Sequence, residues 1–191
     1  MRAIFFYKNQ DIANVSIGKL NRLRGNEMGM IFQDPLTALN PLMMIGDQIS
    51  EAIFLHNKKL SKAHRKERVI ELLKKVGIPR PDYTFNQFPH ELSGGMRQRV
   101  VIAMAIANEP ELLIADEPTT ALDVTIQSQI LDLLKKLKDD IHAGIILITH
   151  DLGVVARWPT EWLLCMRDKL SKLPMFILYL IMPCIRIRGR Y

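Results

Sequence analysis

Cysteine is scarce in this sequence: only Cys165 and Cys184 occur among its 191 residues. Two cysteines are too few for a disulfide-stabilised scaffold, and they suggest nothing about secretion. A basic stretch followed by an apolar stretch is also missing after Met1, so we do not expect export through a signal peptide. With 48% hydrophobic and 24% charged residues, the composition excludes a disordered tail and a membrane bundle. The length predicts one globular domain.

Acidic residues are nearly absent from the end of the chain. Residues 1–156 carry 19 Lys and Arg against 18 Asp and Glu, whereas residues 157–191 carry 7 against only Glu161 and Asp168. The net charge of +6 therefore comes mostly from the tail, which also holds both cysteines and both tryptophans. A basic protein is often a partner of nucleic acid or anionic lipid, but here the charge does not describe the body of the chain. We treat the two parts separately.

Short apolar runs alternate with helical patterns in the body of the chain. Strand-like runs occupy residues 3–7, 28–32, 112–115 and 145–149. Helical spacing occupies residues 44–55, 61–76, 96–108 and 124–137. Ser61 is the expected N-cap of the second helix and Gly77 its expected C′ residue, and two prolines predict a loop at residues 34–41. Buried strands separated by helices predict an α/β fold with a parallel sheet covered on both faces.

Two adjacent carboxylates follow the apolar run at residues 112–115. Ligands of open α/β sheets bind at the carboxyl ends of strands, where Asp116 and Glu117 stand. Asp116 could hold Mg²⁺, which prefers oxygen ligands. Glu117 could orient or deprotonate an attacking water. The alternative is an acidic turn with no chemistry.

Several other segments suggest a site only weakly when each is taken alone. Ser93, Gly94 and Gly95 precede a helix, where free backbone N–H groups bind anions, although an ordinary helix cap has the same composition. His150 ends a buried strand, and a histidine there is more often structural than catalytic. Gln33 follows another strand and is unremarkable by itself.

The order and spacing of these segments resemble the nucleotide-binding subunit of an ABC transporter. Residues 92–96 are similar to the signature motif, 112–117 to the Walker B strand and 121–123 to the D-loop. His150 matches the switch histidine and Gln33 the glutamine of the Q-loop. Each motif is weak alone, but five of them in order make a chance match negligible.

Residues 31–41, 88–99 and 121–125 look like the oligopeptide, dipeptide and nickel importer branch of that family. The resemblance implies a P-loop NTPase fold of the ABC type, present as a partial domain over residues 1–156 with a helical subdomain at about 42–108. It also implies a cytoplasmic ATPase at the inner face of a bacterial membrane. Its expected partners are a homologous ATPase subunit, two permeases and, indirectly, a substrate-binding protein.

The resemblance also implies roles for individual residues, with ATP and Mg²⁺ as cofactors. The γ-phosphate of ATP held by the opposite subunit would be contacted by Ser93, Gly94 and Gly95. Asp123 would also belong to the nucleotide-binding site. His150 would contact the γ-phosphate from its own subunit. Glu117 would orient or deprotonate the attacking water. Asp116 and Gln33 would bind the metal. The loop after Gln33 would face a permease.

The Walker A loop, G-x-x-x-x-G-K-[ST], does not occur in the 191 residues. Gly18 and Lys19 are adjacent, but Leu20 follows in place of the hydroxyl residue, and the preceding glycine is missing. That loop supplies the phosphate-binding backbone, the lysine and a Mg²⁺ ligand. Met1 is expected to enter the fold after this loop and after the residue that stacks on adenine. We therefore expect the isolated chain to lack ATP binding and hydrolysis, and to expose apolar sheet surface that lowers its solubility.

The resemblance stops at Ala156. Family members continue with a strand resembling MADRVVVMYAGQIVE and later with a stretch resembling HPYTR. Codons of residues 157–172 read one base out of frame permit the first sequence, and those of 184–189 permit the second. Trp158 has a single codon, so its last base followed by a proline codon forces the alanine of that strand. We hypothesise a one-base frameshift near codon 156 and a poorly ordered tail at residues 157–191.

Two other functions remain open. One is a non-transport ABC ATPase acting on DNA, against which the residue 34–41 loop and the nearly neutral body argue. The other is a catalytically inactive remnant that binds only a partner subunit.

The basic run at residues 58–68 is interpreted as a solvated helix face, so no nucleic-acid partner is expected. Residues 173–185 are apolar but shorter than the roughly 20 residues that span a bilayer. Dipeptides, oligopeptides and nickel all remain possible substrates.

Overall fold

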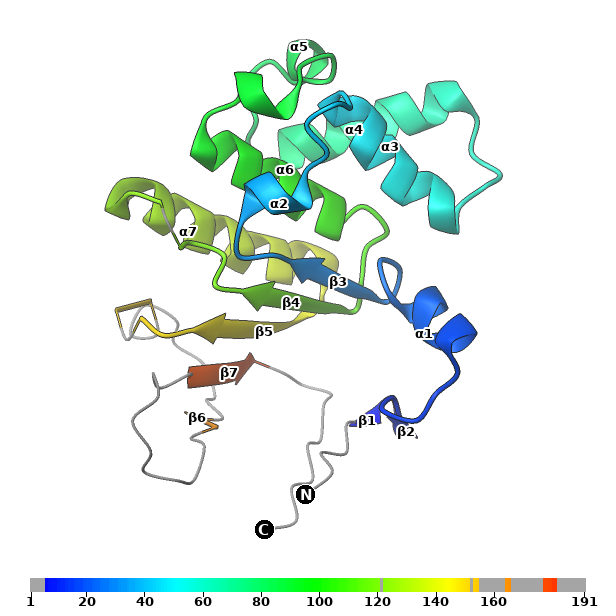
Figure 1. Ribbon diagram of the computed structural model, residues 1–191, viewed down its shortest axis with the longest axis vertical. Helices are drawn as coiled ribbons and strands as arrows, with labels where there is room; N and C mark the ends of the chain where they lie inside the picture. Colours follow the sequence, from blue (N-terminus) through cyan, green and yellow to red (C-terminus); the bar gives the residue numbers. More distant parts are fainter. Residues whose placement is uncertain (1–5, 121, 152, 155–163, 166–176, 182–191) are drawn as a thin grey trace.

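A computed structural model describes residues 6–120, 122–151, 153–154, 164–165 and 177–181 (Figure 1). Its central sheet has the strand order β3-β4-β5-β7-β6. The strands are β3 (Met28–Ile31), β4 (Leu112–Asp116), β5 (Gly144–Thr149), β6 (Leu164–Cys165) and β7 (Ile177–Ile181). A separate two-stranded sheet pairs β1 (Phe6–Tyr7) with β2 (Gln10–Asp11).

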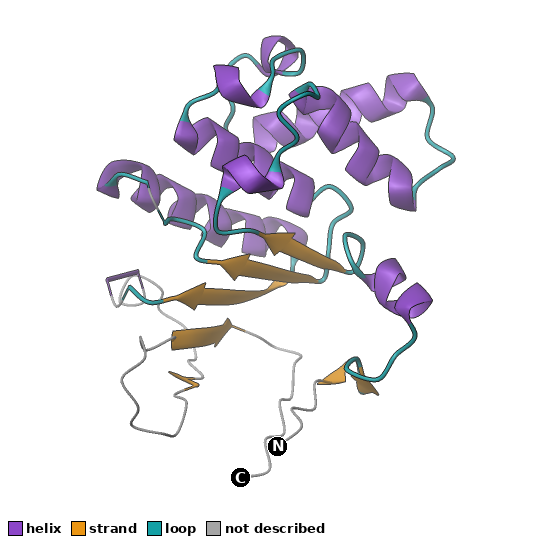
Figure 2. Cartoon of the chain, in the orientation of Figure 1, coloured by secondary structure: helices purple, strands orange, loops and turns teal. Residues whose placement is uncertain are grey.

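All of the described helices except the first gather on one side of the central sheet, as Figure 2 shows, and the first lies beside the end at which β3 begins. The helices are α1 (Ile17–Leu23), α2 (Pro35–Ala38), α3 (Ile45–His56), α4 (Lys62–Lys75), α5 (Pro81–Thr84), α6 (Gly94–Ala105) and α7 (Val124–Ile141), with a 3-10 turn at Pro89–Glu91. The described helices are all too short or too polar to cross a bilayer. The boundaries of a helical subdomain at about residues 42–108 remain a prediction, although α3, α4, α5 and α6 fall within them.

The predicted parallel core is confirmed, but the sheet as a whole is mixed. β3 pairs with β4 and β4 with β5 in parallel, which places Met30, Ile114 and Ile146 side by side. β7 then pairs with β5 in antiparallel orientation. The sequence predicted the parallel core but not this antiparallel strand. An antiparallel neighbour needs no crossover helix, so the alternation of strands and helices carried no signal for β7.

The two faces of the sheet are buried to different extents. Ile31, Leu113 and Ile145 are completely buried in the main apolar core, which also contains residues of α6 and α7. On the other face Met30 is 41% exposed, and Ile114 is partly exposed. Among the described residues, the second face is therefore only partly covered. Residues of β1, α1 and β4 form only a small second cluster.

Helix α4 closely follows its predicted form. The Ser61 hydroxyl accepts a hydrogen bond from the backbone N–H of His64 at 3.3 Å, which caps the first turn. Gly77 follows the last turn with a φ of +74°, the left-handed conformation that glycine adopts without strain. Val69 and Leu73, which are four residues apart, are completely buried. The amphipathic pattern therefore placed this helix and its buried face correctly.

Short helices α1 and α2 were not predicted. α2 lies inside residues 34–41, so the prediction of a loop was wrong for Pro35–Ala38. The Asp34 carboxylate accepts from the backbone N–H of Leu36 at 2.9 Å, and Pro35 occupies the first helical position. A proline there loses no needed donor and favours one helical turn.

One side-chain amide joins the helical layer to the sheet. Asn108, between α6 and β4, donates through Nδ2 to the carbonyl oxygens of Gly25 at 2.7 Å and Ala52 at 3.0 Å. Gly25 precedes β3, and Ala52 belongs to α3. Asn108 therefore connects both layers at the end of the sheet where β3 and β4 begin.

In the tail, residues 164–165 and 177–181 are strands β6 and β7. The remaining residues of 157–191 lie outside the described part, as do most of the predicted strand at 3–7 and Ala121 of the predicted D-loop. The predictions of a frameshifted and poorly ordered tail therefore stay predictions.

Candidate functional site

The carboxyl ends of β3, β4 and β5 bring three predicted site residues together. Gln33 follows β3, Glu117 follows β4 and His150 follows β5. Gln33 Nε2 donates to Glu117 Oε2 at 2.7 Å, and His150 Nδ1 donates to Glu117 Oε1 at 2.7 Å. Parallel strands end at the same edge of a sheet, which explains how residues up to 117 positions apart meet there. The carboxylate of Glu117 is the centre of this group.

A fourth residue, Thr120, completes the contacts of this carboxylate. Its Oγ1 donates to Glu117 Oε2 at 3.0 Å. Both carboxylate oxygens of Glu117 therefore accept hydrogen bonds. Gln33 and His150 donate from other parts of the chain, and Thr120 donates from the same turn. Sequence reasoning missed Thr120, and its position three residues after Glu117 in a turn was the available signal.

The backbone at Glu117 is unusual for a residue with a side chain. Its φ is +44°, in the left-handed region, and its backbone N–H donates to the carbonyl oxygen of Ile148 in β5 at 2.9 Å. Such conformations are uncommon outside glycine and cluster at functional sites. Only 9% of the Glu117 side chain is exposed, whereas 60% of His150 is exposed. The site thus has a buried carboxylate and a histidine that reaches solvent.

Hydrogen bonds lower the pKa of Glu117 below its ordinary value near 4.5. The bond from His150 is the largest cause, and the bonds from Thr120 and Gln33 act in the same direction, while burial opposes them. Donors to a carboxylate favour its charged form. Glu117 is therefore ionised at neutral pH.

This pKa predicts an acid-dependent loss of stability. Because the folded-state pKa is depressed, the stabilising effect is present above the unfolded pKa near 4.5 and is lost as pH falls through the lower folded value. Between neutral pH and about pH 3, wild type should lose roughly 1 kcal/mol more unfolding free energy than Glu117→Gln, the usual net contribution of one hydrogen bond. Urea denaturation followed by circular dichroism measures the difference. Parallel pH profiles of the two proteins would contradict this assignment.

The predicted signature and D-loop residues lie at two neighbouring helix starts. The Ser93 hydroxyl caps α6 by accepting from the backbone N–H of Met96 at 3.3 Å, and Asp123 caps α7 by accepting from that of Ile126 at 2.9 Å. A Cβ atom on Gly95 would lie 2.8 Å from Ile126 Cγ2. The glycine therefore permits close packing of the two helix starts. These capping contacts of Ser93 and Asp123 do not join the two residues to the Glu117 group.

Helix α7 also contacts the segment that follows His150. Gln127 Nε2 donates to Asp151 Oδ2 at 3.2 Å, and the backbone N–H of Gly153 donates to Asp151 Oδ1 at 2.8 Å. The Gly153 bond is the largest cause of the lowered pKa of Asp151. Sequence reasoning missed both Gln127 and Asp151, because nothing in the spacing pairs a helix position with a residue 24 positions later.

The predicted metal ligands are only partly assembled. Asp116 is the last residue of β4 and is partly exposed, and Gln33 uses its amide nitrogen toward Glu117. The described residues contain no group of three or more His, Cys, Asp or Glu that could hold a metal alone. A carboxylate and an amide oxygen suit Mg²⁺, which usually completes its shell with water and phosphate oxygens. The donor chemistry fits a shared metal rather than a closed protein site.

A sequence model of the ABC transporter family matches residues 5–120, more than half of the chain. The chain belongs to this family. It is 59% identical over 155 residues to the oligopeptide transport ATP-binding protein OppD of Bacillus subtilis (strain 168), covering 81% of this chain and 43% of OppD. It is 56% identical over 151 residues to the dipeptide transport ATP-binding protein DppD of the same strain, covering 79% of this chain and 45% of DppD. This ABC transporter family member thus spans less than half the length of these curated relatives.

Solved structures confirm the α/β fold of an ABC-type ATPase. The dimeric structure of the bacterial ABC transporter cassette MJ0796 is 31% identical with a TM-score of 0.69, covering 79% of this chain and 64% of that one. A second dimeric structure of this cassette, in a post-hydrolysis state bound to ADP and Pi, has a TM-score of 0.68 at 31% identity, with 78% and 63% coverage. The order of motifs in the sequence therefore predicted this family and its fold correctly.

Proposed function

We propose that the chain is part of the ATP-hydrolysing subunit of a peptide-type ABC importer. The observation that carries the proposal is the buried Glu117 carboxylate, held by Gln33 and His150 where three parallel strands end. The 59% identity to OppD supports peptides as the class of substrate. The proposal does not extend to DNA-associated ATPases, because residues 1–156 as a whole are nearly neutral.

In this proposal, Glu117 accepts a proton from the attacking water through one of its carboxylate oxygens. The low pKa of this carboxyl keeps it ionised for that role, and Gln33 and Thr120 fix its orientation. His150 releases Oε1 and turns toward the nucleotide, since most of its side chain is already exposed. Asp116 and Gln33 would hold Mg²⁺. Bound ATP supplies the phosphoanhydride bond whose hydrolysis drives transport.

The proposed assembly contains a second, homologous ATPase subunit. Ser93, Gly94, Gly95 and Asp123 would complete the partner's nucleotide site from the two adjacent helix starts. The assembly would also contain two permease subunits. The loop after Gln33, where Leu36 is 58% and Leu42 86% exposed, would face a permease. These two leucine side chains would be accessible to such a partner. The subunit would work at the cytoplasmic face of a bacterial inner membrane and receive substrate indirectly through a binding protein.

We expect the 191-residue polypeptide alone to show no ATP hydrolysis above background and no saturable ATP binding. The Walker A pattern does not occur in it, and that loop normally supplies the backbone cradle and lysine for the phosphates. Phosphate release and fluorescent-nucleotide titration measure the two properties. A normal turnover number with this polypeptide would overturn the prediction.

A chimera tests the proposed function itself. The segment of B. subtilis OppD that aligns with residues 6–154 is replaced by those residues, and the chimera is expressed in a strain that lacks OppD. ATP-dependent oligopeptide uptake is the expected result. A soluble chimera that assembles with the permeases but imports nothing would instead favour an inactive remnant.

The hypothesis of a frameshift near codon 156 has a direct test in the coding DNA. We expect the frame shifted by one base to encode a strand resembling MADRVVVMYAGQIVE in place of residues 157–172, followed later by HPYTR. Sequencing the gene and reading all frames decides the question. A shifted frame without that strand would refute the hypothesis.

A further inference from the structure

The turn between α3 and α4 concentrates positive charge at one corner of the molecule. Residues 52–66, here called the α3–α4 tip, carry five Lys and Arg and no Asp or Glu, whereas the rest of residues 1–156 carries 14 against 18. Lys58, Lys59 and Lys62 are exposed. The ion pairs found among the described residues involve only Lys8, Arg68 and His150 as cations. The three tip lysines are therefore not neutralised within the described chain.

Apolar side chains accompany these lysines at the surface. Leu55 is 62% exposed and Phe54 is 42% exposed in the last turn of α3. The guanidinium of Arg65 lies 4.5 Å from the centre of the Phe54 ring, which joins α3 to the start of α4. The tip thus combines an exposed leucine with uncompensated positive charge.

Local hydrogen bonds fix the shape of the tip. The backbone N–H of Asn57 donates to the carbonyl oxygen of Ile53 at 2.9 Å, and that of Leu60 donates to Asn57 at 3.4 Å. Leu60 packs against the main core, and Ser61 caps α4. The lysines on either side of Leu60 therefore extend from a preformed turn, which lowers the ordering cost of binding.

We propose that the α3–α4 tip binds the surface of a bilayer containing anionic lipids, with Lys58, Lys59 and Lys62 at the phosphates and Leu55 among the acyl chains. The cellular setting rests on the proposed function as a subunit of a membrane transporter. Lysines are flexible point charges that suit a fluid headgroup layer, whereas fixed carboxylates of a protein partner favour the planar fork of arginine. An exposed leucine beside them adds apolar insertion.

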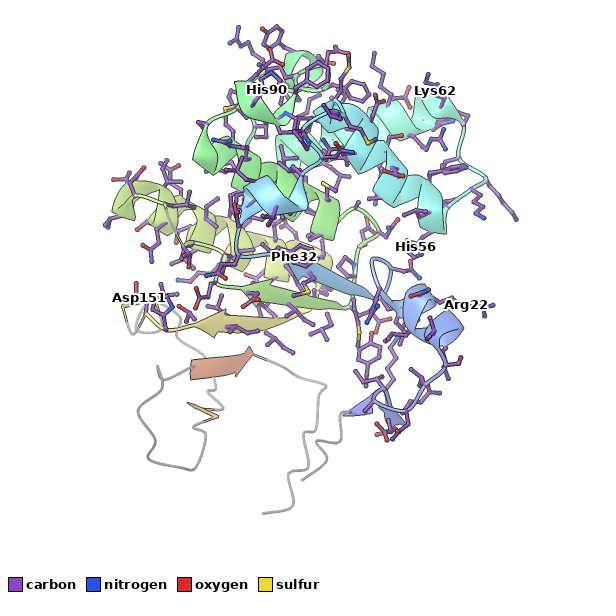
Figure 3. All side chains as sticks on the ribbon, in the orientation of Figure 1. Arg22, Phe32, His56, Lys62, His90 and Asp151 are labelled. Atoms are coloured by element: carbon purple, nitrogen blue, oxygen red, sulfur yellow. The ribbon has the colours of Figure 1, made fainter. Side chains whose placement is uncertain are left out.

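The position of the tip agrees with this role. Figure 3 shows Lys62 at the outer end of the helical layer, on the opposite side of the molecule from Asp151 beside the candidate site. The tip belongs to the same helical layer as α2, whose neighbouring loop is proposed to face the permeases (Figure 1). When this layer faces the membrane, the sheet edge that carries Glu117 therefore remains accessible to a nucleotide and a partner subunit.

Vesicle sedimentation of the full 191-residue chain tests the proposal. Vesicles of equimolar phosphatidylglycerol and phosphatidylcholine are compared with pure phosphatidylcholine. The tip variant is K58Q/K59Q/K62Q, and the matched control is K135Q/K136Q/K138Q on α7, which changes the net charge equally. The tip variant should bind anionic vesicles about 100-fold more weakly than the control, because three lysines near the surface contribute about 1 kcal/mol each. Raising salt to about 0.5 M should remove most of this difference.

Leu55→Ser tests insertion separately and should weaken binding several-fold at both salt concentrations, since a leucine side chain is no longer transferred from water. Residues 157–191 are unchanged in all variants and contribute equally. Equal losses in tip and control variants, or equal binding to neutral vesicles, would overturn the proposal. A lysine effect without any Leu55→Ser effect would overturn the proposal as stated, because binding would then be electrostatic alone, with no leucine among the acyl chains. The assay needs neither ATP nor permeases, so its failure is distinct from failure of the OppD chimera to import.

Discussion

Replacing Glu117 by glutamine in the OppD chimera is expected to lower the rate of ATP hydrolysis roughly 100-fold to 10,000-fold, the range for loss of a positioned general base. The substitution keeps the size of the side chain and one acceptor oxygen for Gln33 or Thr120. It removes the ionised group that takes the proton of water. Steady-state phosphate release at saturating ATP measures the effect, and oligopeptide uptake should fall with it.

Glu67→Gln in the same chimera is the matched control. Glu67 is exposed on α4, far along the chain from the site, and its substitution should leave turnover unchanged. ATP binding should survive in Glu117→Gln, because the proposed role of this carboxylate is proton transfer. A Glu117→Gln chimera that hydrolyses ATP at the unchanged rate would assign the base to another residue.

Gly29→Ala is expected to destabilise the folded chain by about 1–3 kcal/mol, the usual cost of forcing an extra methyl group into a packed interior. Gly29 is buried in β3. A Cβ atom there would meet the carbonyl oxygen of Ala105 at the end of α6, with Leu113 Cδ1 at 3.0 Å and Pro110 Cγ at 3.1 Å. Since the nearest atom belongs to the backbone, the clash cannot be relieved by turning one side chain.

Gly18→Ala provides the control for this prediction. Gly18 lies in α1, and a Cβ atom there would meet no atom within 4 Å. An alanine in an exposed helix is more favourable than glycine by about 0.5–1 kcal/mol, so this variant should be slightly more stable. Urea midpoints of both variants and wild type give the comparison. Equal stability of Gly29→Ala and wild type would show that α6 can move away from β3.

Regular elements of the body could be predicted because their patterns are local. The helix after Ser61 has its cap, its apolar face and its terminal Gly77 within 17 residues, and the structure follows all three. Antiparallel β7 could not be predicted in this way, since its place beside β5 is set by a partner about 30 residues earlier. The single turn α2 was missed because prolines usually interrupt helices but also start them.

The candidate site was predictable as a set of residues but not as a set of contacts. Motif order identified Gln33, Glu117 and His150, and strand topology places them together. The hydrogen bond from Thr120 and the left-handed backbone of Glu117 both depend on the shape of one turn. A glycine would have indicated a left-handed residue, but glutamate stands at that position. The catalytic and ligand-binding roles of all these residues remain predictions that the chimera can test.

The position of Asn108 has a mechanical consequence for the helical layer. Its hydrogen bonds to Gly25 and Ala52 anchor the segment that follows the last turn of α6. The 12 residues of this helix are about 18 Å long, and the end farthest from Asn108 is at Ser93, beside the start of α7. A tilt of about 10° around the anchored end would therefore move the signature residues by about 3 Å while hardly disturbing the beginning of β3. In such a tilt the amide of Asn108 would be the pivot, and the glycines beside Ser93 would move farthest.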